Sequence, residues 1–179
     1  RLVQGDVREV DLAALVGDAP AYKIVANLPY YAAAPALRRF LEAPAPPALL
    51  VVMVQKEVAQ SLSARPGQMS LLTVAVQLYG EPEIVAQVPA RSFYPVPKVD
   101  SAVVRIRVRP RPLLPPPAAD FFALVRAGFS APRKQLRNSL AQGLKVATVE
   151  TERLLEAAGI EPRRRAETLS LEEWLGLYR

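Results

Sequence analysis

The chain has 179 residues, of which 51% are apolar, so it is long enough for one hydrophobic core with a small second domain. It contains neither Cys nor His, which excludes disulfides, Cys nucleophiles, Ser-His-Asp triads and zinc sites built on thiolate or imidazole. Its apolar runs are shorter than the roughly 18 residues of a membrane helix and its net charge is +6, so we expect a cytoplasmic globular protein with a polyanionic partner, without a membrane span or a metal.

Two continuous apolar runs, at 22–26 and 48–54, are typical of parallel strands that are buried on both faces. A helical pattern follows each run, at 32–42 and at 55–64. This alternation of strand and helix predicts an α/β fold.

Residues 69–79 have the apolar spacing of another helix, and strands are predicted at 83–88 and 101–108. A proline-punctuated loop rather than a crossover helix connects these two strands, so we expect them to pair antiparallel. The sheet is then mixed, and the domain that contains it is predicted to span residues 1–109.

Five prolines between 110 and 117 are too many for a helix or a central strand, and they predict a stiff linker at 110–118. Four short helices are expected in a domain at 119–179, with Asp, Ser or Thr as N-caps and Gly143 and Gly159 as stops. Their predicted ranges are 120–129, 132–142, 148–158 and 170–178.

The positive charge is concentrated in the C-terminal part. Residues 101–179 carry 14 Lys or Arg against eight Asp or Glu, whereas residues 1–100 carry nine of each. Arg133, Lys134 and Arg137 are expected within one helical turn, where they can neutralise phosphates. A nucleic acid fits better than a membrane surface because no long amphipathic apolar face accompanies the charge.

The tetrapeptide Asn27-Leu28-Pro29-Tyr30 follows the first apolar run, at the place where open α/β sheets bind ligands. An Asn side-chain oxygen and a neighbouring carbonyl can accept both hydrogens of an adenine amino group, which is a poor nucleophile by itself. Pro29 can fix the turn, and Tyr30 can stack on an extruded base. The tetrapeptide alone is equally compatible with a simple turn.

Residues 25–30, Val-Ala-Asn-Leu-Pro-Tyr, resemble the catalytic motif of the ribosomal RNA adenine N6,N6-dimethyltransferases. Further resemblances follow in order at 54–59, 92–105, 129–138 and 165–170. The resemblance implies a Rossmann-like class I methyltransferase sheet that uses S-adenosylmethionine, followed by a small helical RNA-binding domain.

The resemblance also implies roles for individual residues. Asn27, Leu28, Pro29 and Tyr30 would form the catalytic motif, in which Asn27 and the Leu28 carbonyl orient the target amino group. The implied cofactor contacts are Asp6, Val7 and Asn27, and the implied RNA or base contacts are Phe93, Lys98, Arg133, Lys134 and Arg137. By themselves, Gly5-Asp6 is compatible with a turn and Phe93 with packing under neighbouring prolines.

The chain departs from the family pattern at its start. It begins at Arg1 rather than Met, and it lacks the family's Gly-rich loop after the first strand and the acidic residue that ends the second. We therefore expect an N-terminally truncated member whose first strands are missing, and whose polypeptide alone binds the cofactor poorly and is inactive.

The favoured function is dimethylation of small-subunit (16S) ribosomal RNA during ribosome biogenesis. The expected partner is ribosomal RNA in the small subunit or its precursor, and a monomer is the expected state. Two alternatives stay open, a large-subunit methylase of the antibiotic-resistance branch and a non-catalytic RNA-binding factor of ribosome assembly. The sequences of residues 97–101 and 165–170 favour dimethylation of small-subunit ribosomal RNA.

Overall fold

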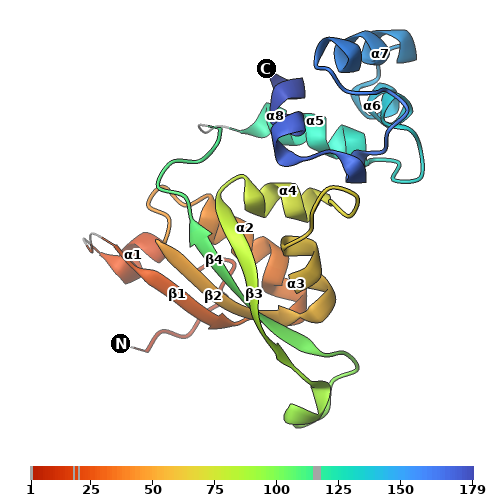
Figure 1. Ribbon diagram of the computed structural model, residues 1–179. Coiled ribbons are helices and arrows are strands. Elements are labelled where there is room, and N and C mark those ends of the chain that lie inside the picture. Colours follow the sequence, from red (N-terminus) through yellow and green to blue (C-terminus); the bar gives the residue numbers. More distant parts are fainter. Residues whose placement is uncertain (1, 18, 20, 115–117) are drawn as a thin grey trace. The chain divides into compact units, whose positions relative to one another are not determined.

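A computed structural model describes residues 2–17, 19, 21–114 and 118–179 (Figure 1). They form two compact units, unit 1 (Arg1–Ser63 and Tyr79–Pro112) and unit 2 (Ala64–Leu78 and Leu113–Arg179). One crossing between the units lies within the expected linker, of which residues 115–117 fall outside the described part. The segment 64–78, expected within the sheet domain, belongs instead to the helical unit.

Unit 1 contains a four-stranded sheet in the order β1-β2-β4-β3 among its described residues. β1 and β2 are parallel, while β4 is antiparallel to both β2 and β3, which confirms the predicted mixed sheet and hairpin. The strands are β1 (Lys23–Asn27), β2 (Leu49–Gln55), β3 (Gly80–Val88) and β4 (Ser101–Val108). β3 begins three residues before its predicted start, and a bulge lies between Ile84 and Ala86.

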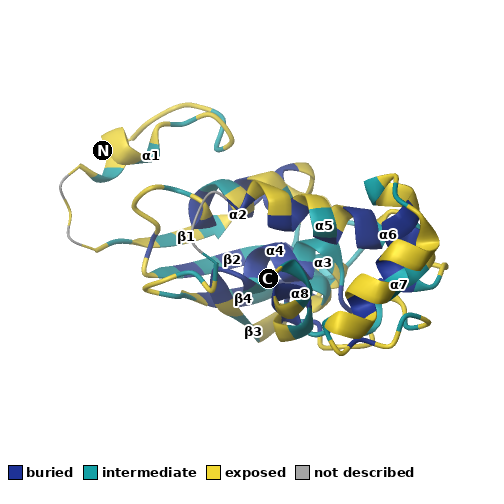
Figure 2. Ribbon diagram, turned by 90° about the horizontal axis from the view of Figure 1, so that it is seen from above, coloured by how far each residue is buried: buried dark blue, intermediate teal, exposed yellow. Residues whose placement is uncertain are grey.

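Helices α2 (Ala33–Leu41) and α3 (Lys56–Leu62) follow β1 and β2 as predicted. The burial of β2 alternates, because Leu50, Val52 and Val54 are fully buried while the intervening side chains are only half-buried. On the half-buried face, Val25 of β1 is 80% exposed. The expectation that both faces of these two strands are buried is therefore wrong for the described residues, because only one face of β2 is covered and no residue of β1 is buried. The ribbon coloured by burial shows buried segments along β2 and exposed segments along β1 (Figure 2).

The N-terminal segment contains a short helix that was not expected, α1 (Leu12–Val16). The Asp11 carboxylate caps it by accepting from the Ala13 N–H (2.9 Å). Gly17 ends it with a positive φ of 61°, which favours a residue without Cβ.

The core of unit 2 contains Trp174, which is fully buried and lies beside Phe129, with 5.6 Å between the ring centres. Leu136, Leu140 and Leu155 are buried with it. The helices of this unit are α4 (Leu71–Gln77), α5 (Ala119–Phe129), α6 (Leu136–Leu144), α7 (Thr148–Ala157) and α8 (Leu171–Tyr178), with a short 3-10 turn at η3 (Ala166–Thr168). Two further 3-10 turns, η1 (Tyr30–Ala32) and η2 (Ala90–Ser92), belong to unit 1. The segment before α4 is tied to this unit because the Gly67 and Met69 N–H groups donate to the Glu167 carbonyl (2.8 and 3.1 Å).

The expectation that Gly143 stops a helix is wrong, because Gly143 lies inside α6. A Cβ there would approach Ala127 Cα to 2.5 Å, so this glycine permits close packing of α6 against α5. Lys145, with φ 58°, closes α6 instead. Gly159, with φ 71°, directly follows the α7 C-cap and is a stop as predicted.

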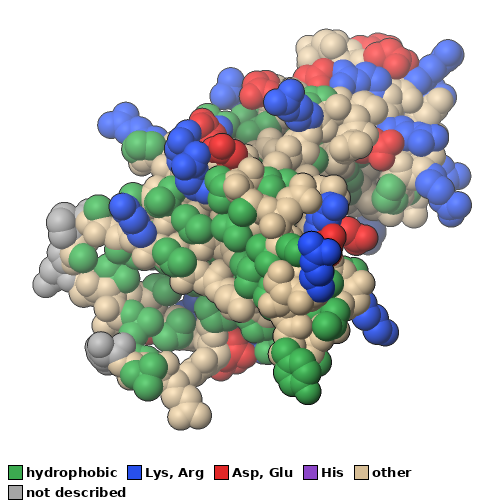
Figure 3. All heavy atoms as spheres, turned by 60° about the horizontal axis from the view of Figure 1, so that its bottom comes forward, with side chains coloured by type: hydrophobic (Ala, Val, Ile, Leu, Met, Phe, Trp, Pro, Cys, Tyr) green, Lys and Arg blue, Asp and Glu red, His purple; other side chains and the backbone are tan. Residues whose placement is uncertain are grey.

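The predicted N-caps are confirmed only at α8, where Ser170 and Glu173 form a capping box. Ala118 and Ala147 precede α5 and α7, and α6 begins at Leu136 rather than at 132. No helix of the described residues has the length and apolarity that crossing a bilayer would require. Apolar side chains nevertheless reach the surface in patches, interleaved with Lys and Arg (Figure 3).

Candidate active site

The Asn27–Tyr30 motif lies at the carboxyl end of β1. The Leu28 N–H donates to the Met53 carbonyl of β2 (3.3 Å), and the Leu28 side chain is buried. Asn27, Pro29 and Tyr30 are exposed around this anchor. The turn therefore presents the Asn27 amide and the Tyr30 ring at the sheet edge, while the buried Leu28 side chain holds the turn in place.

The Tyr30 side chain is tethered across the sheet edge. Its hydroxyl lies 3.1 Å from the Ser101 Oγ at the start of β4, and Ser101 is buried. The Tyr30 ring remains 40% exposed, so it is oriented by the hydroxyl while part of it stays open to a ligand. Sequence reasoning missed Ser101, although its place at the predicted start of a strand was a signal.

Asp100 joins the neighbouring elements at this edge. Its carbonyl accepts from the N–H of Lys56, the residue directly after β2 (3.0 Å), and its Oδ1 accepts from the Ala90 N–H (2.9 Å). The carboxyl ends of β1 and β2, the amino end of β4 and the base of the β3–β4 loop therefore meet around the motif.

Asp6 is held by Arg8. The carboxylate accepts from the Arg8 backbone N–H (2.8 Å), and its Oδ2 lies 2.6 Å from the guanidinium Nη2. These hydrogen bonds lower the pKa of Asp6 to about 2. The Arg8 guanidinium also lies 5.5 Å from the centre of the Tyr31 ring, which connects the Asp6 segment to the residue after the motif. Val7, which lies between Asp6 and Arg8 in the sequence, is half-buried.

Arg39 of α2 fixes the same segment and was also missed by sequence reasoning. Its guanidinium donates to the carbonyls of Arg8 (2.6 Å), Glu9 (3.1 Å) and Val10. Because α2 follows the motif directly, this clamp connects the backbone after Asp6 to the helix that the motif begins.

Phe93 and Lys98 lie on the loop between β3 and β4, which leaves and re-enters the sheet at the motif's edge. Phe93 is half-buried and its N–H donates to the Ala90 carbonyl (3.1 Å), whereas Lys98 is exposed. Both residues therefore lie on a loop that begins and ends at the edge of the sheet where the motif lies.

The three expected phosphate contacts of unit 2 do not share a helical turn, because α6 starts after two of them. Arg133 and Lys134 are exposed in the turn between α5 and α6. Arg137, on α6, is half-buried, forms an ion pair with Glu152 and donates to the Gln135 Oε1 (3.0 Å). The structure therefore gives Arg137 a structural contact that the sequence did not predict.

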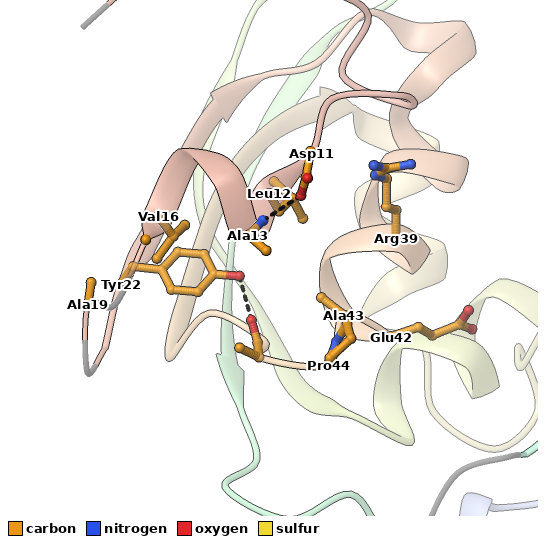
Figure 4. Close-up of a pocket in the computed structure, with 12 residues that line it drawn as sticks. Asp11, Leu12, Ala13, Val16, Ala19, Tyr22, Arg39, Glu42, Ala43 and Pro44 are labelled. Atoms are coloured by element: carbon orange, nitrogen blue, oxygen red, sulfur yellow. Dashed lines mark hydrogen bonds between the residues drawn. The ribbon is translucent and has the colours of Figure 1, made fainter.

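A cavity of about 530 Å³ in unit 1 is lined by none of the site residues predicted from the sequence (Figure 4). Tyr22, which precedes β1, donates to the Ala45 carbonyl (2.7 Å) at its wall, and Arg39 lines it as well. The cavity is thus at the amino end of β1, the end opposite Asn27. In the described part of the chain, no cluster of three or more acidic side chains is arranged to hold a metal.

Comparison with known proteins identifies close relatives. The Ribosomal RNA small subunit methyltransferase A of Dehalococcoides mccartyi is 51% identical over 175 residues, which cover 97% of this chain and 60% of the relative. The protein of the same name from Pelotomaculum thermopropionicum is 44% identical over 189 residues, covering 98% of this chain and 64% of the relative. The chain therefore spans about 60% of the length of such relatives.

Two solved structures share the fold. The crystal structure of the 23S rRNA methyltransferase ErmE matches with a TM-score of 0.71 at 29% identity, over 98% of this chain and 69% of that one. A dimethyladenosine transferase from Plasmodium falciparum matches with a TM-score of 0.80 at 23% identity, over 98% and 70% of the two chains. The mixed sheet with its helices is thus a Rossmann-like methyltransferase fold. A family model described as ribosomal RNA adenine dimethylase matches residues 1–178, and the chain belongs to this family.

Proposed function

We propose that this chain acts in S-adenosylmethionine-dependent N6-dimethylation of adenine in small-subunit (16S) ribosomal RNA during ribosome biogenesis. The observation that carries the proposal is the exposed Asn27 amide beside the tethered Tyr30 ring at the carboxyl edge of the sheet. The identity of 51% to a small-subunit methyltransferase supports the choice of substrate.

In this proposal Asn27 and the Leu28 carbonyl accept the two hydrogens of the target amino group. Holding both hydrogens orients the nitrogen, and acceptors already in place do so without reorganisation during the reaction. The Tyr30 ring, oriented by Ser101, stacks on the extruded adenine. Pro29 restricts the backbone between these groups.

The polar groups of the Asp6 segment fit the adenine end of S-adenosylmethionine. A low pKa keeps the Asp6 carboxylate ionised as an acceptor. A carboxylate has about four lone-pair sites, and the Arg8 backbone N–H, Nε and Nη2 are three donors to them, so the carboxylate retains capacity for one further donor. Val7 and Asn27 would complete the contact. When bound, the cofactor supplies a methyl group activated by sulfonium.

RNA contacts are proposed in both parts of the chain. Phe93 and Lys98 would meet RNA beside the motif, within a catalytic domain at 1–109. Arg133, Lys134 and Arg137 would meet phosphates within an RNA-binding domain at 119–179. A protein with this substrate works where ribosomal subunits assemble, so we place it in the cytoplasm, as a monomer.

A chimera tests the proposal. This chain would replace the matching segment of the Dehalococcoides mccartyi relative, and transfer of labelled methyl groups to under-methylated small subunits would be measured. We expect activity, which Asn27→Ala lowers about 10²–10³-fold without weakening RNA binding. Val149→Ala, at an exposed position of α7, is the matched control. Near-normal turnover by Asn27→Ala would overturn the catalytic role of the motif.

The match to the 23S rRNA methyltransferase ErmE supports a second candidate, methylation of large-subunit RNA. The same assay with protein-free large-subunit RNA separates the two, since methyl transfer to that RNA alone would favour the second. A chimera that binds RNA but transfers no methyl group to either substrate would instead indicate a non-catalytic assembly factor.

A further inference from the structure

The loop between β3 and β4 presents a fully exposed aromatic ring. Tyr94 is 100% exposed, and the nearby Val96 is 64% exposed. The hairpin carrying them projects from the sheet in the ribbon view (Figure 1). Neither side chain is part of the buried core of unit 1, so the apolar surface of both is available to a ligand.

The backbone around Tyr94 is held in a defined conformation. At the base of the loop, Asp100 Oδ1 accepts from the Ala90 N–H (2.9 Å). The turn η2 adds a bond from the Ser92 N–H to the Pro89 carbonyl (2.9 Å). Pro95 and Pro97, which follow Tyr94 in the sequence, each have a restricted φ. Because little conformational freedom remains to be lost, a ligand can bind the ring at low entropic cost.

The charges around the ring favour a polyanion. Arg91 and Lys98 lie three residues before and four residues after Tyr94 in the same loop, and both are exposed. The carboxylate of Asp100, at the end of this loop, accepts from the backbone N–H of Ala90. An aromatic platform between two cations is the combination by which proteins hold single-stranded nucleic acid, because bases stack on the ring while the cations meet phosphates.

We propose that residues 91–98 form a contact for single-stranded RNA, in which Tyr94 stacks on an unpaired base and Arg91 and Lys98 meet the adjoining phosphates. The contact rests on the proposed function and adds to it a recognition element beside the motif. Stacking requires an accessible base face, so the loop selects unpaired over paired RNA. RNA is favoured over a protein partner because both cations of the loop are exposed, while the Asp100 carboxylate accepts a backbone hydrogen bond.

Fluorescence anisotropy of the 179-residue chain with a labelled 12-nucleotide oligoadenylate tests this. Tyr94→Ala should weaken binding roughly 5- to 150-fold, with an unchanged slope of log affinity against log salt. Tyr94→Phe keeps the ring and should bind within about twofold of the parent. Changing Arg91 and Lys98 together to Ala should flatten the slope by about 1.4, or about 0.7 per phosphate contact. Because Tyr94 is fully exposed, its variants should melt like the parent.

Crosslinking gives a second, positional measurement. With 4-thiouridine in the RNA, the tryptic peptide released between Arg91 and Lys98 should carry the crosslink. A parent chain that binds while Tyr94→Ala binds equally well would overturn the loop contact and leave the proposed function standing. A parent chain that binds neither oligoadenylate nor ribosomal RNA would overturn both. If Tyr94→Ala weakened binding to a 12-base-pair duplex as much as binding to the single strand, stacking on an unpaired base would be contradicted. If Tyr94→Ala weakened binding only to ribosomal subunits that carry their proteins, and not to free RNA, the partner of the loop would be a protein.

Discussion

At the scale of single residues, the hydrogen bond between Tyr30 and Ser101 joins two groups in unequal surroundings. Ser101 is 1% exposed, whereas Tyr30 is 40% exposed. A buried hydroxyl that loses its partner cannot turn to water, but a half-exposed phenol can. The energetic result of removing the bond therefore depends on which side chain is changed.

Tyr30→Phe should lower the free energy of unfolding by about 1–3 kcal/mol, because it strands the buried Ser101 hydroxyl. Ser101→Ala should cost less, about 0.5–1.5 kcal/mol, since water can replace its partner. Urea denaturation followed by circular dichroism measures both. The larger loss in Ser101→Ala would show that the Ser101 hydroxyl has another partner.

At the scale of the elements, Gly143 and Gly176 are both helical glycines in different surroundings. Gly143→Ala places a Cβ 2.5 Å from Ala127 Cα, and backbone cannot move aside easily. We expect a net loss of stability, because overpacking costs about 1–3 kcal/mol against a helix-propensity gain of about 1 kcal/mol. Gly176→Ala meets nothing within 4 Å and should stabilise by up to about 1 kcal/mol. Thermal melting of the two variants checks the opposite signs, and a stabilised Gly143→Ala would refute the packing role.

The start of α8 should make stability depend on pH. Hydrogen bonds from Arg164, and then the N–H of Ser170, lower the pKa of Glu173 below its ordinary 4.5. A lowered pKa adds stability that is complete above about 4.5 and is lost as the pH falls through the folded-state value. Glu173→Gln keeps the capping box but loses the charge, so at pH 7 it should be less stable by about 0.5–1 kcal/mol.

The difference between parent and Glu173→Gln should narrow as the pH falls below 4.5. Melting curves at several pH values measure it, with Glu172→Gln, an exposed neighbour in the same turn, as the control. A difference that stays constant down to pH 3 would mean that the charge of Glu173 does not stabilise α8.

At the scale of the whole molecule, the proposed cofactor contacts within this chain are few. They are Asp6, Val7 and Asn27, and none of them lines the cavity of about 530 Å³. A ligand the size of S-adenosylmethionine relies on burying most of its surface in a preformed pocket. We therefore expect the 179-residue chain to bind S-adenosylhomocysteine more weakly than about 1 mM. Calorimetric titration tests this, and micromolar binding would require withdrawing Asp6 as the cofactor contact.

Much of unit 1 could be predicted from the sequence alone, because its signals are local. Continuous apolar runs predicted β1 and β2, and alternation predicted β4, since burial imposes these periods on the sequence. The Asn27–Tyr30 motif was located at a strand end by the same patterns. Ser170 and Gly159 marked helix ends because capping and positive φ depend on neighbours in the chain.

Contacts between groups that are distant in the sequence became visible only in the folded chain. Ser101 orients Tyr30 from 71 residues away, and Arg39 clamps the backbone after Asp6. The same holds for Gly143, whose lack of a side chain serves contact with α5 rather than a helix end. Local sequence patterns predict the strands, the motif and the positive charge of residues 101–179, because these are properties of neighbouring residues. Side-chain partners and the grouping of α4 with the C-terminal helices depend on how elements pack, which no local pattern encodes.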